Sequence, residues 1–471
     1  MSVLSAIVMA AGEGKRMRSR KPKVLHEVGG RPMVRYPIEL AVRLGASPVA
    51  VVTGHMGDEV RDAVAGFGIA GVSTVDQGVP QGTGHAVLTA MPALDGRSGS
   101  TLILSGDVPL LTEGTLRALL ARHQEAGAVL TVLTMELADA GSYGRVVLGE
   151  SGLAERIVEA KDATPAELAI GLVNAGIYAA DLAFLREALP KLGNRNAQGE
   201  YYLTDLVRIA SETGRTVVHS VVADPDEVHG VDDRAKLARA AAVLNRRTLA
   251  ALMREGVTVR DPATTWVDTG VTVGMDTVID PAVELRGSCS VGEGCRIGTG
   301  SVLVDTVLAD RVTIKPYCMI EESRIASDTA VGPMAHLRPG SDLGPNVKIG
   351  NFVEIKKSTF GAGSKASHLT YVGDASVGKN VNIGCGTITC NYDGVNKFQT
   401  EIEDDVFVGS DTQFVAPVKI GRGAYIGSGS TITRDVPADA LAVARGKQRN
   451  IEGWATSAHA PSKKPKIPRE K

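Results

Sequence analysis

An aliphatic residue returns at every sixth position, with single-residue slips, through most of the C-terminal half of the chain. An amphipathic helix needs a period of about 3.6 residues and a half-buried strand a period of 2, so neither explains this pattern. A period of six fits a coiled ribbon in which each short strand and its turn send one aliphatic side chain into a shared core. The pattern therefore predicts a β-solenoid. It is clearest at Val273, Ile279, Leu285, Val291, Ile297 and Leu303, and again at Ile402, Val408, Phe414, Ile420, Ile426 and Ile432.

The composition excludes several classes of protein. A chain of 471 residues is too long for one ordinary core, so we expect at least two domains. The formal net charge of −2 gives no bias toward nucleic acid or an anionic membrane. No apolar run approaches the roughly 18 residues of a membrane span, and no basic segment precedes the first apolar stretch. We therefore expect a cytoplasmic protein without nucleic-acid partners or stable membrane association.

The five cysteines are interpreted as packing residues rather than as a disulfide framework or a metal site. Cys289, Cys295 and Cys318 each follow a core aliphatic residue by four positions. This spacing suits small buried thiols within the solenoid.

The first 230 or so residues alternate short apolar runs with helical patterns. This alternation predicts a Rossmann-like α/β domain with a mostly parallel sheet, whose ligands bind at the carboxyl ends of the strands. The expected strands are Leu4–Met9, Val49–Thr53, Val72–Asp76 and Thr101–Leu104, and the expected helices include Val34–Leu44 and Gly84–Ala90.

Domain boundaries follow from the changes of pattern. We assign residues 1–232 to the α/β domain, 233–255 to one long connecting helix, 256–461 to the solenoid and 462–471 to a basic, disordered tail. The hexapeptide register is interrupted at residues 391–400. Insertions into a solenoid often map to its binding face.

Two segments of the first domain suggest a phosphate site. The first strand leads into Ala10–Met17, where small residues let backbone N–H groups approach a phosphate that Arg16 and Lys23 can neutralise. This loop matches neither common phosphate-binding motif, and glycine-rich turns after strands are frequent. A second buried strand ends in Ser105–Asp107, where a carboxylate can hold Mg²⁺ or simply cap the following helix.

Together these segments carry a specific resemblance. The loop AAGEGKRMRSRKPKVL and the segments Gln81–Ala86, Ser105–Asp107, Tyr143–Arg145, Ile157–Asp162 and Asn174–Gly176 occur in the order found in sugar-nucleotide pyrophosphorylases. With the solenoid attached, nearly the whole chain resembles the bacterial bifunctional N-acetylglucosamine-1-phosphate uridylyltransferases / glucosamine-1-phosphate N-acetyltransferases. The resemblance implies that the solenoid is a left-handed parallel β-helix and that the protein is a homotrimer with acetyl-transfer sites shared between neighbouring coils.

For the first domain, the resemblance implies uridylyl transfer from UTP to N-acetylglucosamine 1-phosphate. Arg16 and Lys23 would face phosphates, and the metal would be Mg²⁺ held by Asp107 and Asp232. The family usually has asparagine at the position of Asp232, so this chain carries an extra negative charge there. The residues implied to bind the nucleotide and sugar are Met9, Ala10, Ala11, Gly12, Lys23, Gln77, Gly82, Thr83, Ser105, Gly106, Asp107, Gly144, Glu159, Asn174 and Asp232, with Arg16 catalytic.

For the solenoid, the resemblance implies acetyl transfer from acetyl-CoA to glucosamine 1-phosphate. The amine needs a base near neutral pH, which suits His368, with Glu354 to orient or assist it and Asn391 near the acetyl group. Residues implied to bind glucosamine 1-phosphate are Arg338, Lys356, Tyr371 and Asn382, and those implied to contact acetyl-CoA are Cys385, Asn391, Tyr392, Ser410, Ser428 and Arg445.

Two other functions stay open from the residues alone. The chain could be a nucleotidyltransferase whose solenoid serves only assembly or regulation, or a scaffold without catalytic activity. A purely structural solenoid would not explain the polar cluster of His368, Glu354 and Arg338. A scaffold without catalytic activity would not explain Asp107 and Lys23.

Overall fold

In the computed structural model, which describes residues 4–454, the first part of the chain folds around a central sheet. Its strand order is β11 (Val217–Val221), β7 (Leu130–Glu136), β10 (Leu172–Asp181), β6 (Ser100–Ser105), β1 (Leu4–Met9), β4 (Val49–Thr53) and β5 (Val72–Asp76). Neighbours pair in parallel except at β10, which runs antiparallel to both β6 and β7. The antiparallel strands β8 (Arg145–Leu148) and β9 (Ala154–Val158) extend from β10. The mostly parallel sheet was predicted, but the reversed strand was not.

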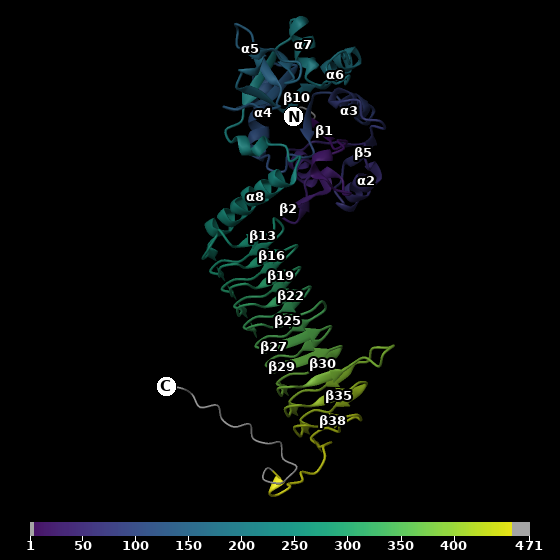
Figure 1. Ribbon diagram of the computed structural model, residues 1–471, viewed down its shortest axis with the longest axis vertical. Coiled ribbons are helices and arrows are strands. Elements are labelled where there is room, and N and C mark those ends of the chain that lie inside the picture. The colour runs from purple at the N-terminus through teal and green to yellow at the C-terminus, as the bar shows by residue number, and fades with distance from the viewer. Residues whose placement is uncertain (1–3, 455–471) are drawn as a thin grey trace. The chain divides into compact units, whose positions relative to one another are not determined.

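Helices cover both faces of this sheet (Figure 1), because its strands are apolar on both sides. Along β1, Ala6 and Val8 pack into one core and Ile7 into the other, as the two-residue period of a strand requires. The first core includes α1 (Arg35–Arg43), α2 (Gly57–Gly66) and α4 (Glu113–Glu125), and the second includes α3 (Thr83–Ala90), α6 (Leu182–Ala188) and α7 (Asp205–Glu212). A single helical turn, α5 (Pro165–Leu168), follows β9.

The predicted long helix is α8 (Arg234–Arg254), and its packing differs from that of a free connector. Ala240 and Val243 lie in a third apolar cluster with Val28 and Met33, beside the short strand pair β2 (Glu27–Val28) and β3 (Arg31–Pro32). The first compact unit therefore extends to Leu252, and it also includes residues 267–270. The predicted connecting helix was 233–255, and α8 groups with the α/β residues that precede it.

The second unit is a solenoid of parallel strands, drawn in Figure 1 as a regular ladder. Successive strands fall on three sides in turn. The first side contains β14 (Thr272–Val273), β17 (Ser290–Val291), β20 (Val307–Leu308), β23 (Arg324–Ile325), β26 (Asp342–Leu343), β28 (Thr359–Phe360), β30 (Ala375–Val377), β33 (Thr400–Ile402) and β36 (Val418–Ile420).

The other two sides join into one sheet. The second side contains β12 (Thr258–Val259), β15 (Val278–Ile279), β18 (Arg296–Ile297), β21 (Thr313–Ile314), β24 (Ala330–Val331), β31 (Asn382–Ile383), β34 (Phe407–Val408), β37 (Tyr425–Ile426) and β39 (Leu441–Ala442). The third contains β13 (Trp266–Val267), β16 (Glu284–Arg286), β19 (Val302–Val304), β22 (Met319–Glu321), β25 (His336–Leu337), β32 (Ile388–Cys390), β35 (Gln413–Val415) and β38 (Thr431–Ile432). Two longer strands, β27 (Lys348–Lys356) and β29 (Lys365–Gly373), bend from the second side to the third.

The aliphatic residues of the hexapeptide period form the solenoid core. All twelve residues that define the period are at most 8% exposed, and Phe414 is fully buried. Residues 391–399 leave the stack between β32 and β33, as the break in the period predicts. The predicted disordered tail, residues 462–471, lies outside the described residues, as does the end of the predicted solenoid segment. No helix within residues 4–454 is long and apolar enough to cross a membrane.

Candidate functional site

A cavity of about 460 Å³ opens at the carboxyl ends of β1 and β6 in the first unit. This is the edge of a parallel sheet at which ligands bind. Predicted nucleotide-site residues that line the cavity are Met9, Ala10, Ala11, Gly12, Lys23, Gln77, Gly82, Thr83, Ser105 and Asp107. Glu13, Val24, Pro80, Ala86 and Glu200 complete the lining. The predicted Gly106 lies directly behind it, where its N–H donates to the Met9 carbonyl at 2.9 Å.

The loop after β1 can turn tightly because its residues are small. Gly14 has a φ of 65°, and a Cβ at this position would lie 2.6 Å from Cβ of Lys23. A side chain at position 14 would therefore be strained by both its backbone and its neighbour. The loop continues through two short 3-10 helices, η1 (Lys15–Met17), which carries Arg16, and η2 (Lys23–Leu25).

Lys23 and Asp107 form the charged centre of the cavity. Lys23 Nζ lies 2.5 Å from Asp107 Oδ2, and Ser105 Oγ donates to Asp107 Oδ1 at 2.6 Å. The two charged side chains are only 16% and 14% exposed. Burial by itself raises the pKa of Asp107, but the Lys23 ammonium and these hydrogen bonds lower it more, so its pKa lies below the ordinary value. Asp107 is therefore a carboxylate at neutral pH.

Asp232 lies near Asp107, because the N–H of the preceding residue, Val231, donates to the Asp107 carbonyl at 2.9 Å. Its Oδ2 accepts a hydrogen bond from Lys236 Nζ at 2.9 Å and forms an ion pair with Arg16 Nη2, also at 2.9 Å. Its Oδ1 is buried and has no hydrogen-bond partner among residues 4–454. A buried carboxylate oxygen without a donor is costly unless a cation or an N–H group reaches it.

The residues predicted to hold the sugar form a second group. The Asn174 N–H donates to the Gly144 carbonyl at 2.8 Å, and a Cβ on Gly144 would lie 3.4 Å from Glu159 Oε1. Thr204 Oγ1 donates to the same Glu159 oxygen at 3.2 Å. Burial raises the pKa of the Glu159 carboxyl, which the Thr204 hydrogen bond opposes. The structure brings these residues together, although none of Gly144, Glu159 and Asn174 lines the cavity itself.

In the second unit, polar residues of successive turns stack on the third side of the solenoid. His336, Glu354, Tyr371 and Ile388 occupy paired register positions on adjacent turns. Arg338, two residues beyond His336, donates Nη1 to Glu354 Oε1 at 3.0 Å. Lys356, two residues beyond Glu354, lies 3.4 Å from Asp374 Oδ2. The same Asp374 oxygen accepts from Asn391 Nδ2, which ties the start of the inserted loop to this cluster. Tyr392, the next residue, is 59% exposed.

His368 lies at the corner before this side. Its Nδ1 is 3.3 Å from Asn351 Oδ1, so its observed partner is Asn351, whereas Glu354 pairs with Arg338. His368, Cys385, Ser410 and Ser428 occupy equivalent positions of successive turns, because each lies three residues after a paired position: Lys365, Asn382, Phe407 and Tyr425. Arg445 continues this column by donating Nη1 to the Ser428 carbonyl at 2.6 Å. Asn382 lies on the second side, half-buried.

Comparisons with known proteins agree with this two-part arrangement. The model of the MobA-like NTP transferase domain matches residues 6–170, and that of the bacterial transferase hexapeptide (six repeats) matches residues 399–434. The chain is 51% identical to the bifunctional protein GlmU of Pelobacter propionicus over 96% of this chain and 98% of that relative. The GlmU of Geotalea uraniireducens is 52% identical over 96% and 99%, and that of Geobacter sulfurreducens 51% over 96% and 98%. The chain belongs to the bifunctional GlmU family.

Membership of the GlmU family confirms the predicted fold class and the predicted type of enzyme. A nucleotidyltransferase domain precedes a hexapeptide domain of the acetyltransferase type, so the chain is a bifunctional transferase. A scaffold without catalytic activity, the broadest alternative from the sequence, is therefore excluded.

Several site residues of this GlmU-family chain were missed by sequence reasoning. The segment 200–204 connects the two groups of the first unit, because the Leu203 N–H donates to Thr83 Oγ1 at 3.0 Å while Thr204 donates to Glu159. In the solenoid, Lys397 on the inserted loop lies beside Lys356, whose ammonium lowers the pKa of Lys397. A run of tyrosines between carboxylates, Glu200–Asp205, was the available signal for the first segment. No sequence pattern pointed to Asp374 or Lys397.

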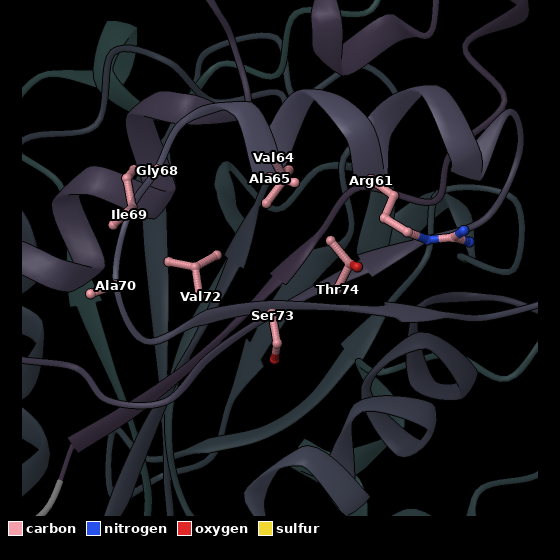
Figure 2. Close-up of a pocket in the computed structure, with 9 residues that line it drawn as sticks. All are labelled: Arg61, Val64, Ala65, Gly68, Ile69, Ala70, Val72, Ser73 and Thr74. Carbon is pink, nitrogen blue, oxygen red and sulfur yellow. The ribbon is translucent and has the colours of Figure 1, made fainter.

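Other features of the chain carry no comparable chemistry. A hollow of about 310 Å³ between α2 and the edge strand β5 is lined mostly by aliphatic side chains, from which Arg61 extends away (Figure 2). None of the five cysteines forms a disulfide, and Cys289, Cys295 and Cys318 are buried as predicted. Burial raises the pKa of Cys295 and Cys318. Among residues 4–454, no three or more His, Cys, Asp or Glu side chains gather into a metal-binding group.

Proposed function

We propose that this enzyme makes UDP-N-acetylglucosamine in two steps. The solenoid transfers the acetyl group of acetyl-CoA to glucosamine 1-phosphate, and the first unit then transfers a uridylyl group from UTP to the N-acetylated product, releasing pyrophosphate. The observation that carries this proposal is that each unit has its own cluster of charged and polar side chains that its core does not require. UTP and acetyl-CoA are cytoplasmic metabolites, so we expect the enzyme to act in the cytoplasm.

In uridylyl transfer, a sugar-phosphate oxygen attacks the α-phosphorus of UTP and pyrophosphate leaves. No covalent enzyme intermediate is needed, so the residues act by positioning and charge neutralisation. Ala10, Ala11 and Gly12 leave room for the nucleotide against the end of β1, and the Gln77 amide, which donates to the Gly82 carbonyl at 3.1 Å, faces the uracil. Lys23 and Arg16 neutralise phosphate charge.

Mg²⁺ fits the carboxylates of this site. Asp107 and Asp232 supply the oxygen ligands that Mg²⁺ prefers, and the unpartnered Asp232 Oδ1 is a buried acceptor suited to a cation. When bound, the ion would supply positive charge that stabilises the negative charge developing on the phosphates. Lys23 Nζ, which lies against Asp107 Oδ2, would share the carboxylate with the ion or move toward a phosphate.

In acetyl transfer, the neutral amine of glucosamine 1-phosphate attacks the thioester carbonyl. His368 accepts the amine proton as the C–N bond forms, and the C–S bond breaks to release the CoA thiolate, which is then protonated. Arg338, Lys356 and Lys397 offer cations to the sugar phosphate. The column from Cys385 to Arg445 gives acetyl-CoA an open track along successive turns. The Asn391 amide, held by Asp374, would contact the acetyl group.

Assembly is proposed from an apolar ridge on the solenoid. Tyr317, Met334, Phe352 and Leu369 lie at one corner of successive turns, between 48% and 61% exposed. All four have positive φ angles, and a hydrogen bond from the Phe352 N–H to the Met334 carbonyl joins two of them. Exposed apolar surface of this kind marks protein contacts. Because His368 adjoins Leu369, a homotrimer packed on this ridge would place neighbouring subunits beside His368 and complete the acetyl site.

One coupled assay tests both steps. The full chain is given glucosamine 1-phosphate, acetyl-CoA and UTP, while free thiol and pyrophosphate are measured in the same reaction. We expect thiol release without UTP, and pyrophosphate release only after acetylation or when N-acetylglucosamine 1-phosphate is supplied directly. Pyrophosphate release without any thiol release would instead support a nucleotidyltransferase with a purely structural solenoid.

A further inference from the structure

The two cations on Asp232 differ in how firmly they are held. Arg16 lies on the one-turn helix η1, and its side chain is 69% exposed. Lys236 belongs to the first turn of α8, whose start is fixed because Asp233 Oδ1 accepts the Lys236 N–H at 2.8 Å. Arg234, in the same turn, donates Nε to the Met17 carbonyl at 3.3 Å. The Lys236 ammonium is therefore attached to a rigid element, whereas the Arg16 guanidinium is attached to a short loop.

Substrate binding would separate these two cations. In the proposed reaction Arg16 turns to the phosphates, and a guanidinium that pairs with a phosphate gives up its contact with Asp232. Without Lys236, the Asp232 carboxylate would then have no cation beside it. Because its side chain is only 17% exposed, water could not fully replace that partner. An unpaired buried charge is strongly unfavourable. Lys236 also holds Asp232 by Oδ2 alone, which leaves the unpartnered Oδ1 available.

We infer that Lys236 is a positioning residue for Asp232. It orients the carboxylate by Oδ2 while Oδ1 remains available to a divalent cation, and it neutralises the charge that an aspartate brings to this position. A lysine four residues after an aspartate is well placed for this pairing at the start of a helix. The inference rests on the proposed uridylyl transfer and on its metal.

A double-mutant cycle tests this role, because a neutral asparagine at position 232 needs no counter-charge. In the parent background, Lys236→Met should weaken Mn²⁺ binding in the presence of UTP and slow pyrophosphate release, each about 10–100-fold, the usual effect of losing a residue that orients a metal ligand. In the Asp232→Asn background the same substitution should change either quantity by less than about twofold. Lys236→Arg should restore most of the loss.

Mn²⁺ binding is measured by electron paramagnetic resonance of the free ion, which does not depend on turnover. Lys191→Met is the control, because Lys191 forms an ion pair of the same spacing and length, 2.9 Å, with Glu187, which does not line the cavity, and should change nothing. If Lys236→Met reduced Mn²⁺ binding and pyrophosphate release equally in both backgrounds, or not at all in the parent, the inference about Lys236 would be overturned while the proposed function would stand. A parent protein that neither binds Mn²⁺ with UTP nor releases pyrophosphate would overturn the proposed function and this inference with it.

Discussion

Replacing Asp107 with alanine should destabilise the first unit as well as stop uridylyl transfer. The change leaves the Lys23 ammonium, which is 16% exposed, without its partner at 2.5 Å. Removing one member of a buried ion pair costs about 3–5 kcal/mol, and water from the adjoining cavity should keep the loss near 3 kcal/mol. Domains are stable by only about 5–15 kcal/mol, so this loss is large.

The double variant Asp107→Ala/Lys23→Met separates stability from chemistry, because it removes both charges. We expect it to regain most of the lost free energy of unfolding while still releasing no pyrophosphate; thiol release by the solenoid should be unchanged in both variants. Urea denaturation followed by circular dichroism at the helical band is suitable, since the α-helices of the described residues lie before residue 255. The reasoning is refuted if Asp107→Ala is within 1 kcal/mol of the parent, or if the double variant is no more stable than the single one.

The contribution of Asp107 to the free energy of unfolding should depend on pH in a defined direction. The pKa of Asp107 in the folded protein lies below its ordinary value of 3.8. A carboxylate with a lowered pKa stabilises the fold above the unfolded-state pKa, and this contribution is lost as pH falls through the folded-state pKa. The advantage of the parent over the double variant should therefore be constant near neutrality and shrink below about pH 4.

Three further changes test other parts of the molecule. Phe414→Ala should cost about 3–5 kcal/mol and reduce thiol release without affecting pyrophosphate release, because each solenoid turn contacts only its neighbours; parallel loss of both activities would contradict this. His368→Ala should slow acetyl transfer about 10²–10⁴-fold and leave uridylyl transfer unchanged, whereas a folded variant acetylating at the parental rate would assign the base elsewhere. A fragment ending at Gly270 should resist urea better than one ending at Glu255, because it keeps the 3.1 Å hydrogen bond from Thr269 to the Gly29 carbonyl, and equal midpoints would show that residues 267–270 add nothing.

The periodic parts of the fold could be predicted because burial imposes the period. One inward position in six predicts the solenoid core, and Leu4–Met9 matches β1 at both ends. The reversal at β10 could not be read from its sequence, because a strand buried on both faces has the same composition in either direction. Residues 267–270 lie between the first strands of the solenoid in the sequence, yet they group with the first unit.

The site was predictable where topology alone brings residues together. Met9 and Ser105 end neighbouring parallel strands, so their loops must meet at one edge. The approach of the Glu200–Thr204 segment and of Lys397 depends on how loops pack, which no local pattern encodes. The Asn351 partner of His368 depends on the register between β27 and β29, which is set by turns of 17 rather than 18 residues.

Because each strand of the solenoid pairs with the equivalent strand of the next turn, the stack can lengthen or shorten only by whole turns. Val273 pairs with Val291 and Ile279 with Ile297, so one full turn separates partners by 18 residues and adds about 4.8 Å to the stack. Excising one such turn closes the ladder with every later side chain still facing its original direction, whereas excising a single hexapeptide rotates all later residues by a third of a revolution. Insertions and deletions within the strands are therefore tolerated only as whole turns, whereas an insertion at a corner can leave the stack, as residues 391–399 do between Cys385 and Ser410 without breaking the column from His368 to Ser428.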